Sequence, residues 1–341
     1  MTATEPNTKS PFPVIDFDGW LSSSSTATSR SKCAADLVRG CHESGFVYII
    51  NHGIPDNLLK EVFELSKNLF DLSHEEKMLA PHPPDPPWHR GYSSVGLEKV
   101  SSTLKEYKES YEVGSEHNLD APPIWLPEAV LPGFRTFSTS FYWTMNAFSQ
   151  QVLGVLAMGL GLSQQQTDEW KKAHTGNNNQ LRLLHYPPLA AWEMEGGEMT
   201  RMPAHTDFGS FTLLLQDDCG GLQAEERASG TLEERRLSRQ YIDVKPMDGA
   251  IVMNVGSLLT RWSNEYLEAP RHRVTLPPLS DRYEGEQRMT RERYSIPYFV
   301  SPDLDTMVET FPSCLEGENA QPKFEKIRWR DYMRMRAQGS Y

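Results

Sequence analysis

Seven short apolar segments, separated by glycine, proline and aspartate turn residues, are spread along the second half of this chain. Their lengths and their β-branched and aromatic content are typical of β-strands. We expect these strands at residues 181–186, 210–216, 221–224, 241–245, 250–255, 273–276 and 294–299. Many short strands punctuated in this way indicate a sandwich or a double-sheet jelly roll.

Apolar residues at helical spacing dominate the first half of the chain and its C-terminal end. They predict helices over residues 32–44, 56–70, 134–162 and 324–337. Residues 14–17 and 46–50 predict short strands, whereas residues 22–31 predict a loop because serine and threonine predominate there. The chain therefore predicts an α+β fold with a double-stranded β-helix (jelly roll) core, flanking helices from an N-terminal module and a C-terminal helix.

The composition restricts the partners and the compartment. The 341 residues are 38% hydrophobic and 23% charged, as in ordinary soluble globular proteins. A formal net charge of −12 argues against nucleic acid, because neutralising phosphates needs a concentrated basic surface. No apolar run approaches the roughly 20 residues of a membrane helix, and the first residues lack the apolar core of a secretory signal. The four cysteines include no Cys-x-x-Cys pair, so we expect a cytoplasmic protein with reduced thiols and no membrane or nucleic-acid partner.

A His-x-Asp motif and a distant histidine form the candidate metal site. Side chains two residues apart in a strand point the same way, so His205 and Asp207 can reach one ion. His272 follows the predicted strand at residues 250–255 and a segment that would return the chain to the sheet. Because a jelly roll brings such distant strands side by side, we expect His272 to be the third ligand.

This set of residue types favours iron over zinc. A structural zinc site is usually closed by four ligands and often includes cysteine, and the cysteines here do not cluster. Two histidines and one carboxylate hold Fe(II) on one face and leave the opposite face open for oxygen chemistry. Among the competing histidines, His52 lies in a turn and His185 should point away from Tyr186 by strand alternation, whereas His174 stays a competitor.

Short motifs follow one another in a fixed order along nearly the whole chain. They are PVIDF at residues 13–17, GFVYIINHGI at 45–54, KESYEVG at 108–114, LRLLHYPP at 181–188, HTD at 205–207, GGLQ at 220–223, HRV at 272–274 and RYS at 293–295. In this order they resemble the Fe(II)/2-oxoglutarate-dependent dioxygenase superfamily, in the branch that includes isopenicillin N synthase and the plant and fungal biosynthetic dioxygenases. Several motifs in order are far more specific than any one of them.

The resemblance implies how the cofactors are held. Fe(II) would bind the three ligands named above, with O2 as the oxidant, and 2-oxoglutarate would chelate the iron through its oxo-acid end. Arg293 and Ser295, two apart on a predicted strand, would anchor the distal carboxylate, whose geometry the planar guanidinium matches. Tyr186 matches a position that faces the co-substrate.

Two features depart from the family pattern. The asparagine that usually stands two residues before Tyr186 is replaced by Leu184. The connection from His272 to Arg293 is longer than usual, and its extra length falls in a polar loop, residues 277–291. This loop brings three competing arginines, Arg282, Arg288 and Arg291. Only Arg293 has a serine two residues later and the Ile-Pro-Tyr-Phe continuation.

The resemblance also implies where a substrate binds. It would lie between an N-terminal dioxygenase module, residues 1–120, and the open end of the jelly roll within residues 121–341, which also include the long helix. Candidate substrate-binding residues are Arg182, Phe211, Tyr92, Phe299 and Tyr111, with Arg90 and Phe208 as further candidates. Phe211 and Phe299 could equally belong to the core, and Tyr111 could close the packing between the modules.

The activity implied by the resemblance is oxygenation of a small organic metabolite, in specialised-metabolite biosynthesis, through a ferryl-oxo intermediate. Hydroxylation is the default outcome, and desaturation, cyclisation or rearrangement use the same intermediate. Two alternatives stay open: an oxidase like isopenicillin N synthase that does not use 2-oxoglutarate, and a non-catalytic binding protein on the same fold. The Arg-x-Ser motif also occurs in that oxidase and does not decide between them. The sequence determines neither the substrate nor the oligomeric state.

Overall fold

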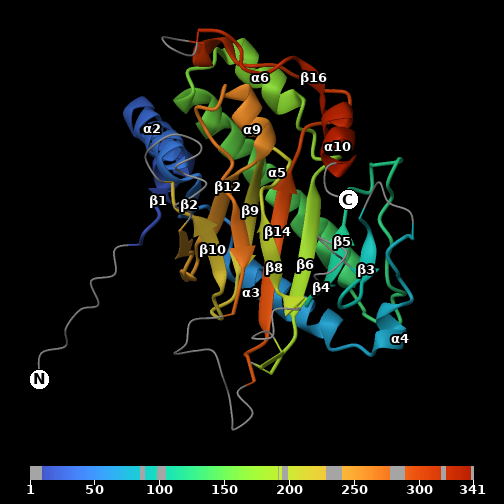
Figure 1. The fold of residues 1–341 in the computed structure, drawn as a ribbon. Helices are drawn as coiled ribbons and strands as arrows, with labels where there is room; N and C mark the ends of the chain where they lie inside the picture. The colour runs from blue at the N-terminus through green and yellow to red at the C-terminus, as the bar shows by residue number, and fades with distance from the viewer. Residues whose placement is uncertain are drawn as a thin grey trace, which may run out of the picture.

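The fold consists of two β-sheets that face one another, with helices packed on the outer side of the larger sheet (Figure 1). The computed structural model describes residues 10–84, 89–97, 105–190, 192–193, 199–227, 240–276, 289–315 and 320–338. The predicted α+β jelly roll is confirmed.

The larger sheet has eight strands in the order β1-β2-β12-β9-β14-β6-β5-β3. They are β1 (Val14–Asp16), β2 (Phe46–Ile50), β3 (Gly91–Ser93), β5 (Glu109–Val113), β6 (Gln180–Tyr186), β9 (Phe211–Gln216), β12 (Ile251–Val255) and β14 (Arg293–Val300). Neighbouring strands are antiparallel except for the parallel pair β1 and β2. The first 120 residues thus supply two strands at each edge of a sheet whose four central strands come from the rest of the chain.

The smaller sheet is antiparallel and has the order β11-β10-β13-β8. Its strands are β8 (Met202–His205), β10 (Leu222–Glu225), β11 (Tyr241–Asp243) and β13 (His272–Val274). Two minor pairs complete the β-structure: β4 (Lys105–Glu106) with β7 (Met199–Thr200), and β15 (Met307–Val308) with β16 (Ile327–Arg328). Pairing of β8 with β13 brings together two segments that lie far apart in the sequence.

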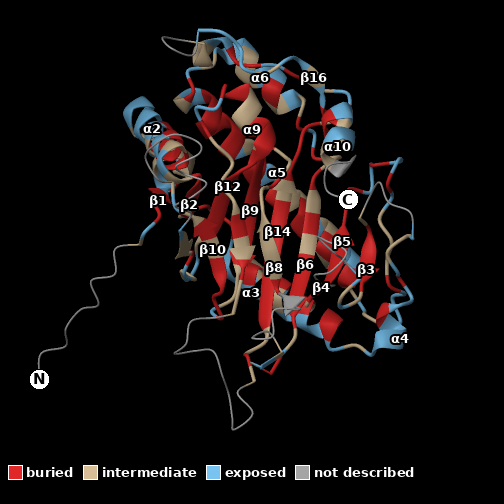
Figure 2. Cartoon of the chain, viewed as in Figure 1, coloured by how far each residue is buried: buried red, intermediate tan, exposed pale blue. Residues whose placement is uncertain are grey.

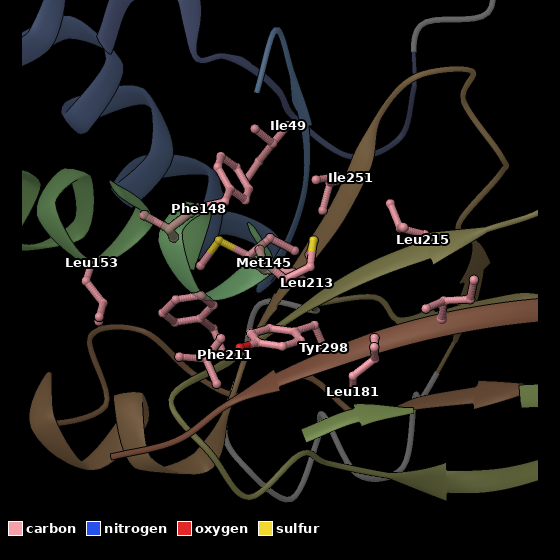
Figure 3. Packing of buried hydrophobic residues seen from close by; sticks show 14 of the residues in the cluster. Ile49, Met145, Phe148, Leu153, Leu181, Phe211, Leu213, Leu215, Ile251 and Tyr298 are labelled. Carbon is pink, nitrogen blue, oxygen red and sulfur yellow. The ribbon is translucent and has the colours of Figure 1, made fainter. Parts of the chain in front are cut away.

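Three long helices cover the outer face of the larger sheet: α2 (Ala27–Ser44), α3 (Asp56–Phe70) and α5 (Phe134–Gly159). The shorter helices are α1 (Asp18–Leu21), α4 (His74–Lys77), α6 (Gln164–Lys172), α9 (Ser257–Trp262), α10 (Trp329–Gln338) and the 3₁₀ turn η2 (Pro312–Cys314). Helix α5 runs behind the sheet, and its buried residue Met145 packs near Phe211 and Tyr298 of the strands (Figure 3). Among the described residues, none of the helices has the length and apolar character of a membrane span.

Strand alternation divides the buried residues of the larger sheet into two cores. In β9, Phe211, Leu213 and Leu215 face the helices, whereas Leu214 faces the smaller sheet. Both faces of the central strands are therefore largely buried, which Figure 2 shows as red with tan stretches along the middle of the sheet. Functional side chains have to lie on the face between the two sheets if they are to meet residues of β8 and β13.

The predicted elements are present with shifts at particular boundaries, but the sequence expectation did not include strands β3 and β5 or helices α6 and α9. Helix α2 begins at Ala27, inside the predicted loop at residues 22–31. The reason is a capping box: Ser29 N donates to Thr26 Oγ1 at 3.1 Å and Thr26 N donates to Ser29 Oγ at 2.9 Å. The C-terminal helix begins at Trp329, later than predicted. Residues 277–288 of the predicted long loop lie outside the described residues.

Candidate active site

Three side chains converge where strands β8 and β13 meet. His205 ends β8, His272 begins β13, and the two residues face each other in the antiparallel register. Their Nε2 atoms lie 3.7 and 3.6 Å from Oδ1 of Asp207, in that order. One ligand atom from each of the three residues lies within 4.8 Å of the others. The three predicted ligands are therefore brought together, with all three donor atoms directed at one point.

The carboxylate of Asp207 is oriented by two residues of the larger sheet. Asp207 follows the end of β8 and is not itself in a strand, so strand alternation alone does not explain its direction. Thr212 Oγ1 and Asn254 Nδ2 donate hydrogen bonds to Oδ2 at 2.5 and 2.7 Å. Thr212 and Asn254 are register partners on β9 and β12. They occupy one oxygen and leave Oδ1 facing the two imidazoles.

The backbone around Asp207 is held by the start of helix α9. Ser257 donates to the Asp207 carbonyl oxygen through its backbone N at 2.9 Å and through Oγ at 2.8 Å. Gly256 lets these segments approach, because a Cβ there would lie 2.1 Å from the Gly209 carbonyl oxygen. The loop that carries the carboxylate is thus fixed from both its side chain and its main chain.

The surroundings favour the protonation states that a metal needs. Burial lowers the pKa of His272 to about 4, and the nearby His205 adds to this effect, so the ring is neutral at pH 7. Burial opposes ionisation of Asp207, but the two imidazoles and the two hydrogen bonds outweigh it and lower the pKa of that carboxyl. Neutral imidazole and ionised carboxylate are the forms that bind a divalent cation.

Backbone carbonyls determine which nitrogen of each imidazole faces the cluster. Nδ1 of His205 lies 2.9 Å from the Pro203 oxygen, and Nδ1 of His272 lies 3.3 Å from the Pro270 oxygen. A proton on Nδ1 leaves the Nε2 lone pair free for an ion. With two such nitrogens and one carboxylate oxygen, the donor set fits Fe(II) with open coordination positions.

The competing histidines are held by other contacts. A ring nitrogen lies 3.0 Å from Gly249 O in His52, 2.8 Å from Ser210 Oγ in His174 and 2.8 Å from Glu109 Oε1 in His185. The cluster that the described residues form includes none of them.

The residues predicted to bind 2-oxoglutarate lie deeper between the sheets. Arg293 and Tyr186 are register partners on β14 and β6, both are fully buried, and the guanidinium carbon lies 5.0 Å from the centre of the Tyr186 ring. Nε of Arg293 donates to Gly220 O at 2.9 Å, and Nη2 lies 3.5 Å from Gln216 Oε1. Ser295 lies two residues further on the same face of β14. Nη1 of Arg293 and the Tyr186 hydroxyl have no hydrogen-bond partner among the described residues.

The departures from the family pattern have simple structural outcomes. Leu184 belongs to the apolar core between the sheets. Arg291 forms an ion pair with Asp218 at 2.8 Å, in which both side chains are partly exposed, so it does not compete with Arg293. Arg282 and Arg288 lie outside the described residues.

Two of the predicted substrate residues face the space between the sheets. Arg182 Nε lies 2.5 Å from Oε1 of the fully buried Glu112, its register partner on β5. Phe299 is the register partner of Gln180 on one side and of Thr212 on the other. Because Thr212 bonds Asp207, this wall of the sheet adjoins the metal cluster. Glu112 is a polar residue of this wall that the sequence did not single out as a substrate contact.

Three other predicted substrate residues are corrected by the structure. Phe211 faces the helices in the outer core, opposite to the cluster (Figure 3). Tyr111 packs edge-on against Phe134, with ring centres 5.0 Å apart, and Tyr92 donates to Glu109 Oε2 at 2.6 Å in the same outer core. The physical reason is strand alternation: these residues lie on the helix-covered face of strands whose neighbouring residues point inward.

The C-terminal helix reaches the segment that carries the cluster. Arg336 of α10 donates to Thr206 Oγ1 and to Ser257 Oγ, each at 3.2 Å, and its guanidinium carbon lies 4.4 Å from the centre of the Phe208 ring. Phe208, a further substrate candidate, follows Asp207 directly and lies under a cation from α10. Arg90 is buried and donates to backbone carbonyl groups.

Comparison with known proteins agrees with this geometry. Residues 12–130 match the model of the non-haem dioxygenase N-terminal region named from morphine synthesis, and residues 177–302 match that of the 2OG-Fe(II) oxygenase superfamily. The 2-oxoglutarate-dependent dioxygenase htyE of Aspergillus rugulosus is 34% identical, over 90% of this chain and 93% of its own. The proline hydroxylase buaE of Petromyces alliaceus is 36% identical, over 84% and 86%.

A solved structure gives the same result. A full-length Neurospora crassa protein, crystallised in complex with 2-oxoglutarate and thymine, superimposes with a TM-score of 0.83 at 31% identity, over 97% of both chains. The extent of these similarities shows the family, and with it the iron and 2-oxoglutarate dependence. The chain belongs to the 2OG-Fe(II) oxygenase superfamily and is a 2-oxoglutarate-dependent non-haem iron dioxygenase.

Proposed function

We propose that this enzyme hydroxylates a small polar metabolite, with Fe(II) held by His205, Asp207 and His272. The observation that carries the proposal is the convergence of these three donor atoms beside an inward-facing wall of the larger sheet. Bound Fe(II) and 2-oxoglutarate together supply the oxidising power for attack on a substrate C–H bond. The protein contributes position and charge.

Each group of residues has a separate part in this proposal. The ionised Asp207 balances part of the metal charge, and the hydrogen bonds to its Oδ2 keep Oδ1 directed at the ion. Arg293, Ser295 and Tyr186 hold the distal carboxylate of 2-oxoglutarate in a buried space where a charge-assisted hydrogen bond is strong. Burial of this pocket excludes water from the co-substrate.

The substrate class is proposed from the polar wall next to the cluster. Arg182 and Glu112 place a guanidinium and a carboxylate side by side on the inward face. The guanidinium of Arg182 would meet a substrate carboxylate, and Glu112, whose Oε1 pairs with Arg182 and whose Oε2 accepts from Gln180 Nε2, would orient it, so an amino acid or an amino-acid-derived metabolite fits this wall. The naming of one relative as a proline hydroxylase supports this class. Phe299 would pack against the apolar part of the substrate.

The two parts of the chain would then have distinct tasks. Residues 1–120 would act as the N-terminal module that supplies Glu112 and covers the substrate, and residues 121–341 as the unit that carries iron and co-substrate. All four cysteines are described and form no disulfide, which supports a reducing, cytoplasmic location.

The proposal is tested first by adding Fe(II) and 2-oxoglutarate to the protein without oxygen and recording the visible spectrum. A weak charge-transfer band is expected in the unmodified protein and should be absent in His205→Ala and Asp207→Ala, both of which should keep the native circular dichroism. Succinate release is then measured with proline and with thymine, the ligand in the Neurospora crassa complex. Iron and 2-oxoglutarate binding that survives both substitutions would contradict the ligand assignment, and coupling to thymine alone would contradict the amino-acid class.

A further inference from the structure

A second arginine, which no motif marked, lies buried near the residues proposed to hold 2-oxoglutarate. Arg201 immediately precedes β8, and its side chain is completely buried. Nη2 donates to the Arg291 carbonyl oxygen at 2.9 Å and to Thr290 Oγ1 at 3.3 Å. Nε and Nη1 have no hydrogen-bond partner among the described residues. An arginine is almost never buried in this way without an anion.

The free donors of Arg201 and of Arg293 lie around the same aromatic ring. The guanidinium carbon of Arg201 is 5.7 Å from the centre of the Tyr186 ring, and that of Arg293 is 5.0 Å from it. Burial lowers the pKa of Arg201, and the charge of Arg293 lowers it further, as expected for two cations in one dry space. Nε and Nη1 of Arg201, Nη1 of Arg293 and the Tyr186 hydroxyl are thus four unused polar groups in one region.

The local charges do not balance. The half-buried Asp217 lies near Arg293, and its oxygens accept hydrogen bonds from the backbone N atoms of Cys219 at 3.0 Å and Tyr294 at 2.5 Å. Burial raises the pKa of Asp217, so it offers at most one negative charge against two guanidinium groups. Burial also raises the pKa of the Cys219 thiol beside Arg201, which keeps that thiol neutral.

In the part of the chain that the structure describes, no carboxylate lies within ion-pair distance of Arg201 or Arg293. A buried excess of positive charge is costly unless an anion neutralises it. An anionic ligand that binds both guanidinium groups would balance this charge.

We propose that Arg201 is a second anchor for the distal carboxylate of 2-oxoglutarate, acting together with Arg293. The inference deepens the proposed function and rests on it, since it assigns a further binding residue to the same co-substrate. Two guanidinium groups aimed at one carboxylate make the pocket selective for oxo acids that carry a second acid group. An oxo acid without the distal carboxylate would leave both cations buried and unpaired.

The competing explanation is that Arg201 only ties the start of β8 to residues 290 and 291. The two explanations differ in how affinity depends on the ligand. A structural tie predicts that losing the side chain affects all oxo acids equally, through stability. If Arg201 is an anchor, losing its side chain should weaken the binding of 2-oxoglutarate but not of pyruvate, because pyruvate has no distal carboxylate.

The test compares Arg201→Gln with the unmodified full-length protein by titration calorimetry, with Mn(II) in place of Fe(II) so that no turnover occurs. The dissociation constant for 2-oxoglutarate should rise about 10- to 100-fold, the usual effect of losing hydrogen bonds to a charged group. The dissociation constant for pyruvate should change by less than about twofold, which is within the error of the measurement. Arg261→Gln is the matched control, because Arg261 also donates to a backbone carbonyl, at 2.7 Å, but lies on α9 against Phe324 and Tyr332.

If Arg201→Gln does not fold, Arg201→Lys keeps the charge, and the ratio of the 2-oxoglutarate and pyruvate constants in that variant decides instead. A lysine ammonium cannot reproduce two guanidinium donors, so the ratio should still rise severalfold. An unchanged ratio in the variant that folds overturns the inference. If the unmodified protein itself fails to bind 2-oxoglutarate, the proposed co-substrate pocket fails, and the inference with it.

Discussion

Replacing Thr212 by valine tests whether the hydrogen bonds to Asp207 determine metal affinity. The change removes one hydroxyl and keeps the shape of the side chain in a position that is 3% exposed. It deletes the 2.5 Å hydrogen bond to Oδ2 and leaves Asn254 as the only side-chain donor to that oxygen among the described residues. A hydrogen bond to a buried charged group contributes about 1.5–3 kcal/mol. Metal affinity should therefore fall about 10- to 100-fold, because the carboxylate is free to turn away from the imidazoles.

The assay is an anaerobic titration with Fe(II), and with Co(II) as a spectroscopic substitute, at pH 7. Thr310→Val is the matched control, since Thr310 is also buried and its hydroxyl donates to a carbonyl, Arg261 O at 3.3 Å, away from the cluster. Both variants should unfold at similar temperatures. A metal affinity of Thr212→Val within about twofold of that of the unmodified protein would refute the reasoning. The Thr212 hydrogen bond would then contribute less than about 0.5 kcal/mol to metal binding.

Contacts elsewhere in the structure lead to three more predictions. Burial lowers the pKa of His174 from 6.5 to about 4. The unfolded chain therefore takes up a proton first as pH falls, and the free energy of unfolding should drop by about 3 kcal/mol between pH 6.5 and pH 4. His174→Gln should reduce this pH dependence in urea unfolding, and an unchanged pH dependence would exclude the histidine as its source. Phe211→Ala should cost about 3–5 kcal/mol of unfolding free energy with little change in 2-oxoglutarate affinity, and a specific loss of ligand binding would instead restore Phe211 to the site. Arg336→Ala removes the hydrogen bond to Thr206, next to the ligand Asp207, so it should weaken metal and substrate binding with little change in melting temperature. Metal affinity and kinetic constants equal to those of the unmodified protein would show that α10 has no part in the site.

Local sequence patterns predicted most elements because period and propensity are short-range properties. Helix α3 and strand β2 match their predicted ranges, since helical spacing and β-branched content are strong there. The start of α2 was missed because serine and threonine favour both loops and N-caps, and only the reciprocal bonds of Thr26 and Ser29 show which role they have. Motif order identified the family, and with it the iron and the co-substrate.

The faces of the strands were decided only by the tertiary structure. Strand β9 is buried on both sides because helices cover one face and the smaller sheet covers the other. The sequence does not show which of these two buried faces points at the site, so it left Phe211 open between a substrate contact and the core residue that it is. Phe299 lies on the face toward the smaller sheet, which only its register with Thr212 shows.

The residues that support the metal cluster and the proposed co-substrate site are likewise brought together only by the tertiary structure. Asn254 lies beside Thr212 through strand register, and Arg201 and Arg293 lie near the same Tyr186 ring because the two sheets pack face to face. The spacing of these residues along the chain does not predict that they are neighbours. The sequence by itself determined the long helices, many of the strands, the family and the residue types that can hold iron and a carboxylate. The tertiary structure decided which side chains share one buried space, because charge, burial and hydrogen bonding depend on neighbours that are distant along the chain.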